Sequence, residues 1–165
     1  MTPDWESVLR QPNYSWEQRY PGATNDQLAR LTEYFGRSLP QDYAAFLRLS
    51  DGAGLWHGDL WYIRLWRSAD IPSWSAAYGF VPTKMHGAIA FGDDGGEEGL
   101  VFDIRPERAE GPYPVFAVNL VSVGWKEALP IADDFRQLLL LSRELLHRAD
   151  HPKRDARNPG SADQR

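Results

Sequence analysis

The first regular pattern of apolar positions in the chain predicts a helix over residues 24–36. Thr24 and Gln27 have the spacing of a capping box, in which each side chain pairs with the backbone N–H of the other residue. An apolar stripe at spacings of three and four follows, and a glycine ends it: Leu28, Leu31, Phe35 and Gly36.

A second short amphipathic helix is predicted directly after the first. Pro40 suits the first turn of a helix, because its missing N–H would be unpaired there in any case. The buried side of this helix is expected to hold Tyr43, Phe46, Leu47 and Ser50. Asp51 and Gly52 then stop the helix, since glycine accepts the left-handed conformation that follows a helix end.

Beyond residue 54 the pattern changes to short apolar and aromatic runs of strand length. We expect these runs to form strands at 55–56, 60–66, 88–91, 100–104 and 115–120. Turns are expected at 57–59 and 93–99, and mostly loop at 67–86 and 105–114. A last helix is expected to begin at Leu129 or Pro130, with an apolar side that continues to Leu146.

Helices, then strands, then a helix indicate an α+β fold. We expect one domain with tails, built on a mainly antiparallel sheet of about five to six strands, with N-terminal helices and a C-terminal helix packed on it. The expected segments are an irregular N-terminal part at 1–23, the domain at 24–148 and a disordered tail at 149–165. Within the first segment, Trp5, Val8 and Leu9 are expected to form one helical turn.

Composition narrows the classes of partner. The net charge of −5 argues against a general nucleic-acid binder, which needs a basic footprint. The chain has no cysteine, which excludes disulfides and thiolate metal sites. Neither a basic start with an apolar run nor an apolar stretch of ~20 residues is present. We therefore expect a cytoplasmic protein with no signal peptide and no membrane partner.

Acidic residues are concentrated in one part of the chain. Seven lie between residues 93 and 110, against Arg105 and Arg108. Four of them fall in one glycine-rich turn: Asp93, Asp94, Glu97 and Glu98. The turn lacks the alternating ligands of an EF-hand. Three interpretations stay open, namely a solvated hairpin, a docking surface for a basic protein, and a divalent-cation site.

Other catalytic signals are weak. His147 and His151 stand four residues apart, a spacing that can share a metal on a helix, but no glutamate occupies the metalloprotease position between them. Neither a nucleophile elbow nor a phosphate-binding loop motif occurs. We expect no catalytic residue, no cofactor and no metal site. Asp42 is expected to favour a helix dipole, and Asp51 to be a turn residue.

The chain contains seven tryptophans, and large aromatics dominate both cores and interface hot spots. Trp61 and Trp66 lie in or beside an expected strand, one face of which is expected to be core. The opposite face, if uncovered, would present aromatics to a partner. Trp74, beside Pro72 and Ser73, is a candidate for an exposed anchor. We therefore take Trp61 and Trp74, together with the acidic turn, as candidate partner-binding residues.

Three segments, in order, resemble the SUKH superfamily, in the branch named after yeast cell-wall assembly regulators (Smi/Knr-like). The first is the Leu39-Pro40-x-Asp42-Tyr43 step with its Phe-Leu pair and glycine-rich exit. The second is a strand, an acidic glycine turn and a strand that ends in Asp, at 89–103. The third resembles the closing helix of the family, at 131–139. The segment at 71–86 matches no pattern of the family.

The resemblance implies a non-catalytic, protein-binding α+β domain. Bacterial members are commonly immunity proteins, which bind and neutralise the effector domain of a polymorphic toxin, often a nuclease or deaminase. The acidic turn would then mimic nucleic-acid charge against a basic toxin surface, with aromatics as anchors. Two alternatives stay open: an intracellular regulatory or scaffolding adaptor, and a metal-dependent hydrolase built around the acidic turn. The toxin and the oligomeric state are not defined by the sequence.

Overall fold

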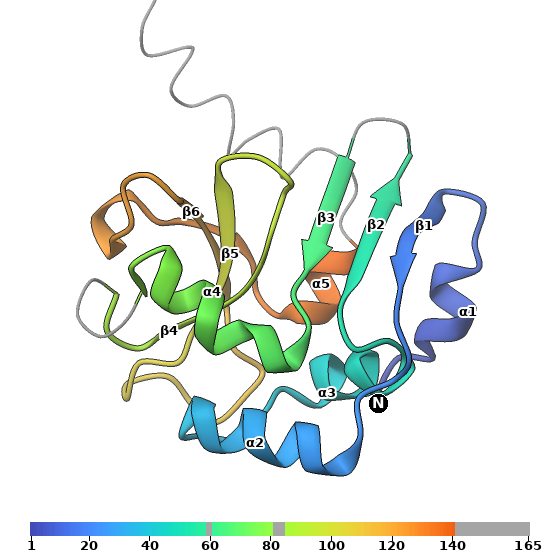
Figure 1. Cartoon of the computed structure of the whole chain (residues 1–165), viewed down its shortest axis with the longest axis horizontal. Coiled ribbons are helices and arrows are strands. Elements are labelled where there is room, and N and C mark those ends of the chain that lie inside the picture. Colours follow the sequence, from blue (N-terminus) through green and yellow to red (C-terminus); the bar gives the residue numbers. More distant parts are fainter. Residues whose placement is uncertain (59–60, 81–84, 141–165) are drawn as a thin grey trace, which may run out of the picture.

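The computed structural model describes residues 1–58, 61–80 and 85–140. Within these residues the α+β fold expected from the sequence is confirmed (Figure 1). The expected disordered tail at 149–165, the last turns of the predicted closing helix, and His147 and His151 lie outside the described residues.

One antiparallel sheet of seven strands forms the centre of the domain, and the order of its strands in space is their order in the chain. Each strand pairs antiparallel with its sequence neighbour. The sheet is therefore a simple meander, slightly larger than the five to six strands expected. Its strands are β1 (Tyr14–Arg19), β2 (Ala53–His57), β3 (Trp61–Leu65), β4 (Ala88–Asp93), β5 (Glu98–Asp103), β6 (Val115–Asn119) and β7 (Leu129–Ala132).

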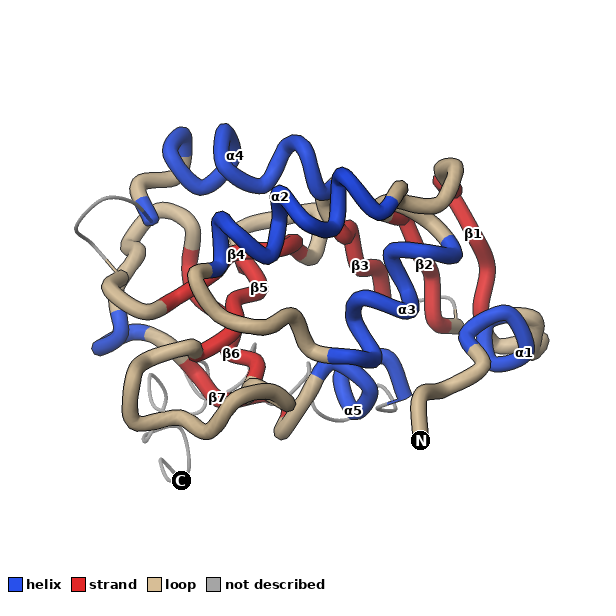
Figure 2. Tube along the Cα trace, turned by 90° about the horizontal axis from the view of Figure 1, so that it is seen from below, coloured by secondary structure: helices blue, strands red, loops and turns tan. Residues whose placement is uncertain are grey.

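Helices lie on both faces of this sheet. The α-helices are α1 (Trp5–Leu9), α2 (Asn25–Phe35), α3 (Gln41–Leu49), α4 (Ile71–Ala77) and α5 (Phe135–Leu140), with short 3₁₀ helices η1 (Ser68–Asp70) and η3 (Trp125–Glu127). Helix α4 lies on one face, over the middle of the sheet, whereas α3 and α5 lie on the opposite side (Figures 1 and 2). Helix α2 runs along one end of the strands (Figure 1).

The predicted signals of α2 are confirmed, and α3 forms as expected, but Pro40 precedes its first residue and the helix ends at Leu49, with Ser50 extended, before Asp51 and Gly52. The capping box of α2 is present, because Thr24 accepts from the Gln27 backbone N–H and the Gln27 side chain accepts from that of Thr24. Gly36 ends α2 with a φ of 69°, in the left-handed region. The helical turn expected at Trp5 is also present, as α1.

Three parts of the sequence prediction are wrong. Residues 1–23 are not irregular throughout, because β1 forms the edge of the sheet; its mostly exposed side chains hide the alternation of a strand. Residues 71–77 form α4 and not loop, with Pro72 in the first turn, where proline does not break a helix. Leu129 begins the edge strand β7 and not the closing helix, which starts at Phe135.

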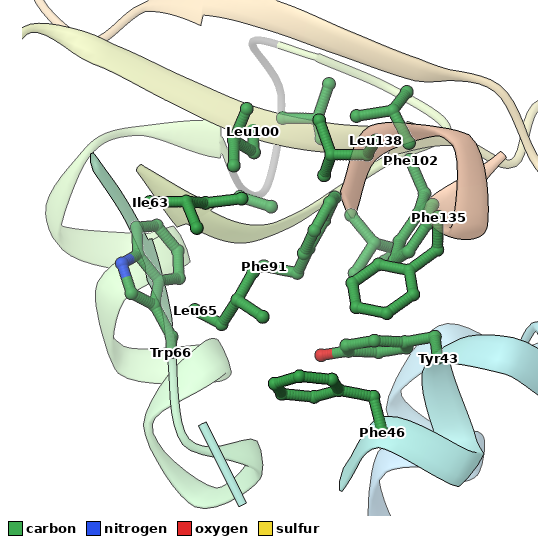
Figure 3. Packing of buried hydrophobic residues seen from close by; sticks show 14 of the residues in the cluster. Tyr43, Phe46, Ile63, Leu65, Trp66, Phe91, Leu100, Phe102, Phe135 and Leu138 are labelled. Carbon is green, nitrogen blue, oxygen red and sulfur yellow. The ribbon is translucent and has the colours of Figure 1, made fainter. Parts of the chain in front are cut away.

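An aromatic core joins the three segments that resemble the family (Figure 3). Phe91 and Phe102, from neighbouring strands, stack with ring centroids 4.1 Å apart. Tyr43 of α3 packs on Phe102 at 5.2 Å and on Phe135 of α5 at 5.0 Å. Phe46 lies 5.6 Å from the same Phe135. Each segment therefore supplies part of one buried cluster.

Asp42 has a larger role than the helix dipole expected from its position. One carboxylate oxygen accepts from the Tyr43 backbone N–H at 2.9 Å. The other accepts from the Arg136 backbone N–H in the first turn of α5, also at 2.9 Å. Asp42 thus ties the start of α3 to the start of α5, and so helps to fix both helices against the sheet.

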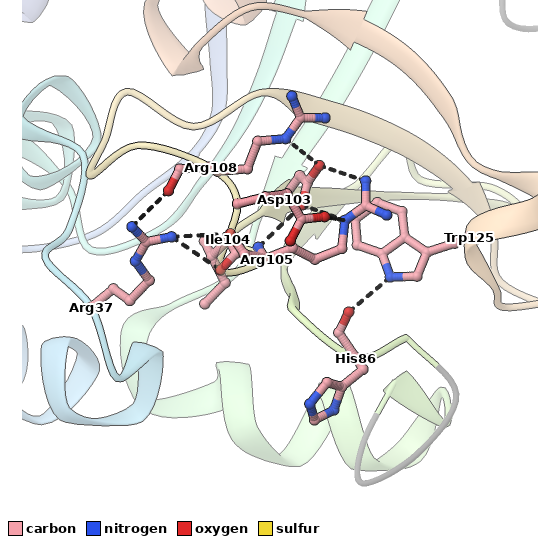
Figure 4. A network of polar contacts seen from close by, with 8 residues as sticks. Arg37, His86, Asp103, Ile104, Arg105, Arg108 and Trp125 are labelled. Atoms are coloured by element: carbon pink, nitrogen blue, oxygen red, sulfur yellow. Dashed lines mark hydrogen bonds and ion pairs between the residues drawn. The ribbon is translucent and has the colours of Figure 1, made fainter.

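A network of arginines holds the loop between β5 and β6 (Figure 4). The buried carboxylate of Asp103 accepts from Arg105 at 2.9 Å and from Arg108 at 2.8 Å. From the other side, Arg37 donates to the backbone carbonyls of Ile104, Arg105 and Arg108. Burial opposes ionisation of Asp103, but the Arg105 and Arg108 guanidiniums outweigh it and lower its pKa.

The hydroxyl of Tyr43 gives a first prediction. Tyr43 and Tyr113 are both 0% exposed. Among the described residues the Tyr43 hydroxyl has no hydrogen-bond partner, whereas that of Tyr113 donates to Ser38 O and Glu110 at 3.1 Å each. In urea unfolding, Tyr43→Phe should leave the free energy of unfolding unchanged or raise it by up to about 1 kcal/mol, and Tyr113→Phe should lower it by about 1 kcal/mol. A loss above about 1 kcal/mol for Tyr43→Phe would contradict this.

The Asp103 network gives a pH prediction. The folded-state pKa of Asp103 lies below its unfolded value, so its contribution to stability is complete above about pH 5 and is lost as the pH falls through the lowered pKa. Asp103→Asn should therefore lower the free energy of unfolding by about 2 kcal/mol at pH 7. The difference from wild type should shrink as the pH falls below about 4, the usual pKa of an aspartate, and through the lowered pKa of Asp103. A difference that does not change with pH would contradict the expectation.

Candidate functional site

The acidic turn between β4 and β5 is divided between the interior and the surface. Asp93 is only 1% exposed, and one of its carboxylate oxygens accepts from Arg64 Nη2 at 2.8 Å and from Trp66 Nε1 at 2.7 Å. The other oxygen accepts from the Gly95 backbone N–H at 2.8 Å. The expectation that Asp93 contacts a partner is therefore corrected, because its carboxylate is buried and fully paired.

The other three acids of the turn reach the surface to different degrees. Asp94 is half-buried, and its carboxylate accepts from the backbone N–H groups of Gly96 at 2.8 Å and Glu98 at 3.2 Å. Glu98 is half-buried at the start of β5, and Glu97 is exposed at the tip. Asp94 thus shapes the turn, and Glu97 is the acid that the turn presents most openly.

The remaining acids of residues 93–110 are mostly neutralised within the chain. Asp103 pairs with Arg105 and Arg108, and Glu107 lies 3.7 Å from Arg105. Glu110 pairs with Arg37 at 3.2 Å. The acidic excess seen in the sequence is therefore smaller as a surface charge, because arginines from several segments fold back onto it.

The two candidate tryptophans have opposite environments. Trp61 is 8% exposed, and its ring meets His57 edge-on at 5.7 Å. The expectation that Trp61 contacts a partner is therefore corrected, because its side chain is buried. Trp74 of α4 is 38% exposed. It stacks on Tyr78 at 5.5 Å and on Trp66 at 5.9 Å, which holds the exposed ring in one orientation.

Beside α4, the same face of β1, β2 and β3 carries no helix among the described residues (Figure 1). The register of β2 and β3 pairs Trp56 with Tyr62 and Gly54 with Arg64, so these residues share that face. An open cavity of about 360 Å³ lies here. Charged residues from β1, β3 and the η1–α4 segment line it, together with aromatic residues: Glu17, Tyr20, Tyr62, Arg64, Asp70 and Trp74. We call this cavity and its rim the open face.

Tyr62 stands at the centre of the open face. A Cβ atom on Gly54 would lie 2.8 Å from the Tyr62 hydroxyl and 3.3 Å from Glu17 Oε2, so both groups converge over this glycine. A Cβ on Gly95 would lie 2.8 Å from the Tyr62 ring, which places the acidic turn against the same side chain. Burial and the carboxylate of Glu17 raise the pKa of Tyr62 to about 12, so the phenol is neutral at physiological pH.

Sequence reasoning missed Glu17, Tyr62, Arg64 and Asp70 as parts of this site. Alternation along β3 was available as a signal, because Tyr62 and Arg64 occupy alternate positions between buried residues. Glu17 and Asp70 come from segments interpreted as irregular or loop, and only the pairing of β1 with β2 and the turn at η1 bring them to one cavity.

The described residues contain no group of three or more metal-ligating side chains that could hold an ion. In this part of the chain, no helix has the length and apolar character needed to cross a membrane. The geometry thus defines an α+β domain with an open aromatic and charged sheet face. The model of the SMI1/KNR4 family (SUKH-1) matches residues 22–141, and the chain belongs to this family. A comparison with curated proteins found no match.

The environment of Asp93 predicts a strong effect on stability. Asp93→Ala should lower the free energy of unfolding by about 3 kcal/mol, because it leaves the Trp66 N–H buried without its acceptor and removes the partner of Arg64. Glu97→Gln, in the same turn, should change it by less than about 0.5 kcal/mol. Urea unfolding of both variants tests whether Asp93 is structural and Glu97 is not. Similar decreases in the free energy of unfolding for the two variants would contradict this.

Proposed function

We propose that this protein is an immunity protein, which binds the effector domain of a cognate polymorphic toxin in the cytoplasm and neutralises it without catalysis. Membership of the SMI1/KNR4 family supports this at the level of the class, because immunity proteins are common among bacterial SUKH proteins. The toxin domain would be of the nuclease or deaminase class.

The open face is the observation that carries this proposal. A sheet face without a helix, with the exposed ring of Trp74 held by stacking, is suited to bury a partner surface. Helix α4, which supplies Trp74, borders this face and lies within the residues that the family model matches.

Neutralisation would then proceed by occlusion. A rigid aromatic centre would desolvate the contact, while the carboxylates of Asp94, Glu97 and Glu98 at the edge would attract a basic surface and raise the rate of association. Gly95 of the same turn approaches the Tyr62 ring, so the acidic turn borders the open face. Surface charge influences the on-rate and the aromatic contact influences the off-rate.

The test has two stages. The tagged protein is used to capture partners from its own host, and the captured protein is then expressed as its C-terminal domain. This domain should be toxic alone and harmless when co-expressed with the immunity protein. Capture of housekeeping proteins, none of which is toxic, would contradict immunity and favour the regulatory or scaffolding adaptor.

A variant of Trp74 makes the test specific to the open face. Trp74→Ser should weaken capture of the toxin domain at least about tenfold, since truncating an aromatic hot spot costs 2 kcal/mol or more. Leu140→Ser removes another exposed apolar side chain, from α5 on the opposite side of the sheet (Figures 1 and 2), and should leave the affinity within about twofold. Thermal unfolding of both variants shows that they are folded. If the two variants bind the toxin domain with equal affinity, the interface does not include the open face.

A further inference from the structure

The charges around the cavity of the open face do not balance once the buried partners of its two arginines are counted. Four charged side chains line it: Glu17, Arg64, Arg67 and Asp70. Arg64 is held by Asp93, and Arg67 lies 3.9 Å from the carboxylate of Asp51. Both of these aspartates are buried and lie outside the lining of the cavity. The charges of the two arginines are therefore compensated by buried aspartates outside the cavity.

Glu17 and Asp70 have no such compensation. Both are exposed, and neither forms an ion pair with a cation in the described ranges 1–58, 61–80 and 85–140. Counted with the buried partners of the arginines, the cavity carries the charge of two carboxylates. Asp94 and Glu97 on the neighbouring turn have the same sign and, in the described residues, no ion-pair partner either. The local field therefore favours a cation.

The walls of the cavity suit a guanidinium or ammonium group. Tyr20, Tyr62 and Trp74 line it, and ring faces attract cations. The chain itself uses this chemistry, because Arg67 lies 4.7 Å above the ring of Tyr20 and Arg64 lies 5.9 Å from that of Trp74. The Tyr62 hydroxyl and the Glu17 carboxylate converge over Gly54, where the floor has no side chain. Hydrogen-bond acceptors and aromatic walls thus occur together.

We infer that this cavity takes an arginine or lysine side chain of the protein partner, with Glu17 and Asp70 as its carboxylate ligands. The inference rests on the proposed function and names the feature of the toxin domain that is recognised. The partner is a protein with a protruding basic side chain, and its backbone covers Trp74 and the acidic turn. An anionic partner group is disfavoured, because the two arginines of the cavity already have carboxylate partners.

The probe for this site is a blocked tripeptide, acetyl-Gly-Arg-Gly-amide, titrated into the purified full chain. Its neutral analogue, with citrulline in place of arginine, keeps the shape and removes the charge. The indole N–H signal of Trp74 in NMR spectra, assigned with Trp74→Phe, reports occupancy. The arginine peptide should shift this signal with a Kd of about 1 to 10 mM, and the citrulline peptide should not.

Two double variants with the same change of net charge separate the site from the overall field. Glu17→Gln with Asp70→Asn should weaken binding of the arginine peptide at least about fivefold. Glu33→Gln with Glu127→Gln, at exposed positions outside the cavity, should keep it within about twofold. The inference is overturned if the two double variants weaken binding equally, if citrulline binds as well as arginine, or if the arginine peptide causes no shift at about 10 mM.

The outcome is independent of the test of immunity. If the peptide fails to bind while the chain still protects cells from a captured toxin domain, the cation site is wrong and the proposed function stands. If the peptide binds as expected but no captured protein is toxic, the cavity is a cation site of a different binding protein.

Discussion

The two halves of the sheet are joined by a short contact between β3 and β4, and the rest of the structure depends on it. Only Arg64 with Asp93, and Leu65 with Gly92, are in register there. A Cβ atom on Gly92 would lie 2.5 Å from the Arg64 carbonyl oxygen, so only glycine lets the two backbones approach. Phe91, just before it, packs into the aromatic core. Of three consecutive residues, Phe91 thus packs in the core, Gly92 makes the backbone contact, and Asp93 lies on the opposite face.

The same contact creates the candidate site. The buried side chain of Asp93 lies on the face of the sheet opposite the aromatic core, where it accepts hydrogen bonds from Arg64 and Trp66. The ring of Trp66 in turn stacks on that of Trp74. The exposed part of the open face is therefore built on the pair of Arg64 with the buried Asp93 and on an aromatic stack. Such a surface is ordered before it meets a partner, and a preorganised surface loses less conformational entropy on binding.

The sequence predicts local features well where one turn of chain contains the whole signal. The capping box of α2 and the proline start of α3 are of this kind. It predicts poorly where the answer depends on a distant partner. The acids of residues 93–110 look like one patch, but Asp93 and Asp103 are buried beneath arginines. The edge strand β1 is mostly exposed, so its strand character is evident only from its pairing with β2.

In this topology the sheet and the aromatic core depend on contacts of very different sequence separation. Each strand pairs with its sequence neighbour, but only β2 with β3 and β4 with β5 follow each other closely enough to close over a short turn at little entropic cost; helices α2 and α3 come between β1 and β2, and α4 comes between β3 and β4. The core is different, because Phe135 of α5 packs against Tyr43 and Phe46 of α3, about ninety positions earlier. During synthesis these two hairpins can therefore form one after the other, while the aromatic cluster waits for its last member. A ribosome must release α5 before the chain holds a closed interior.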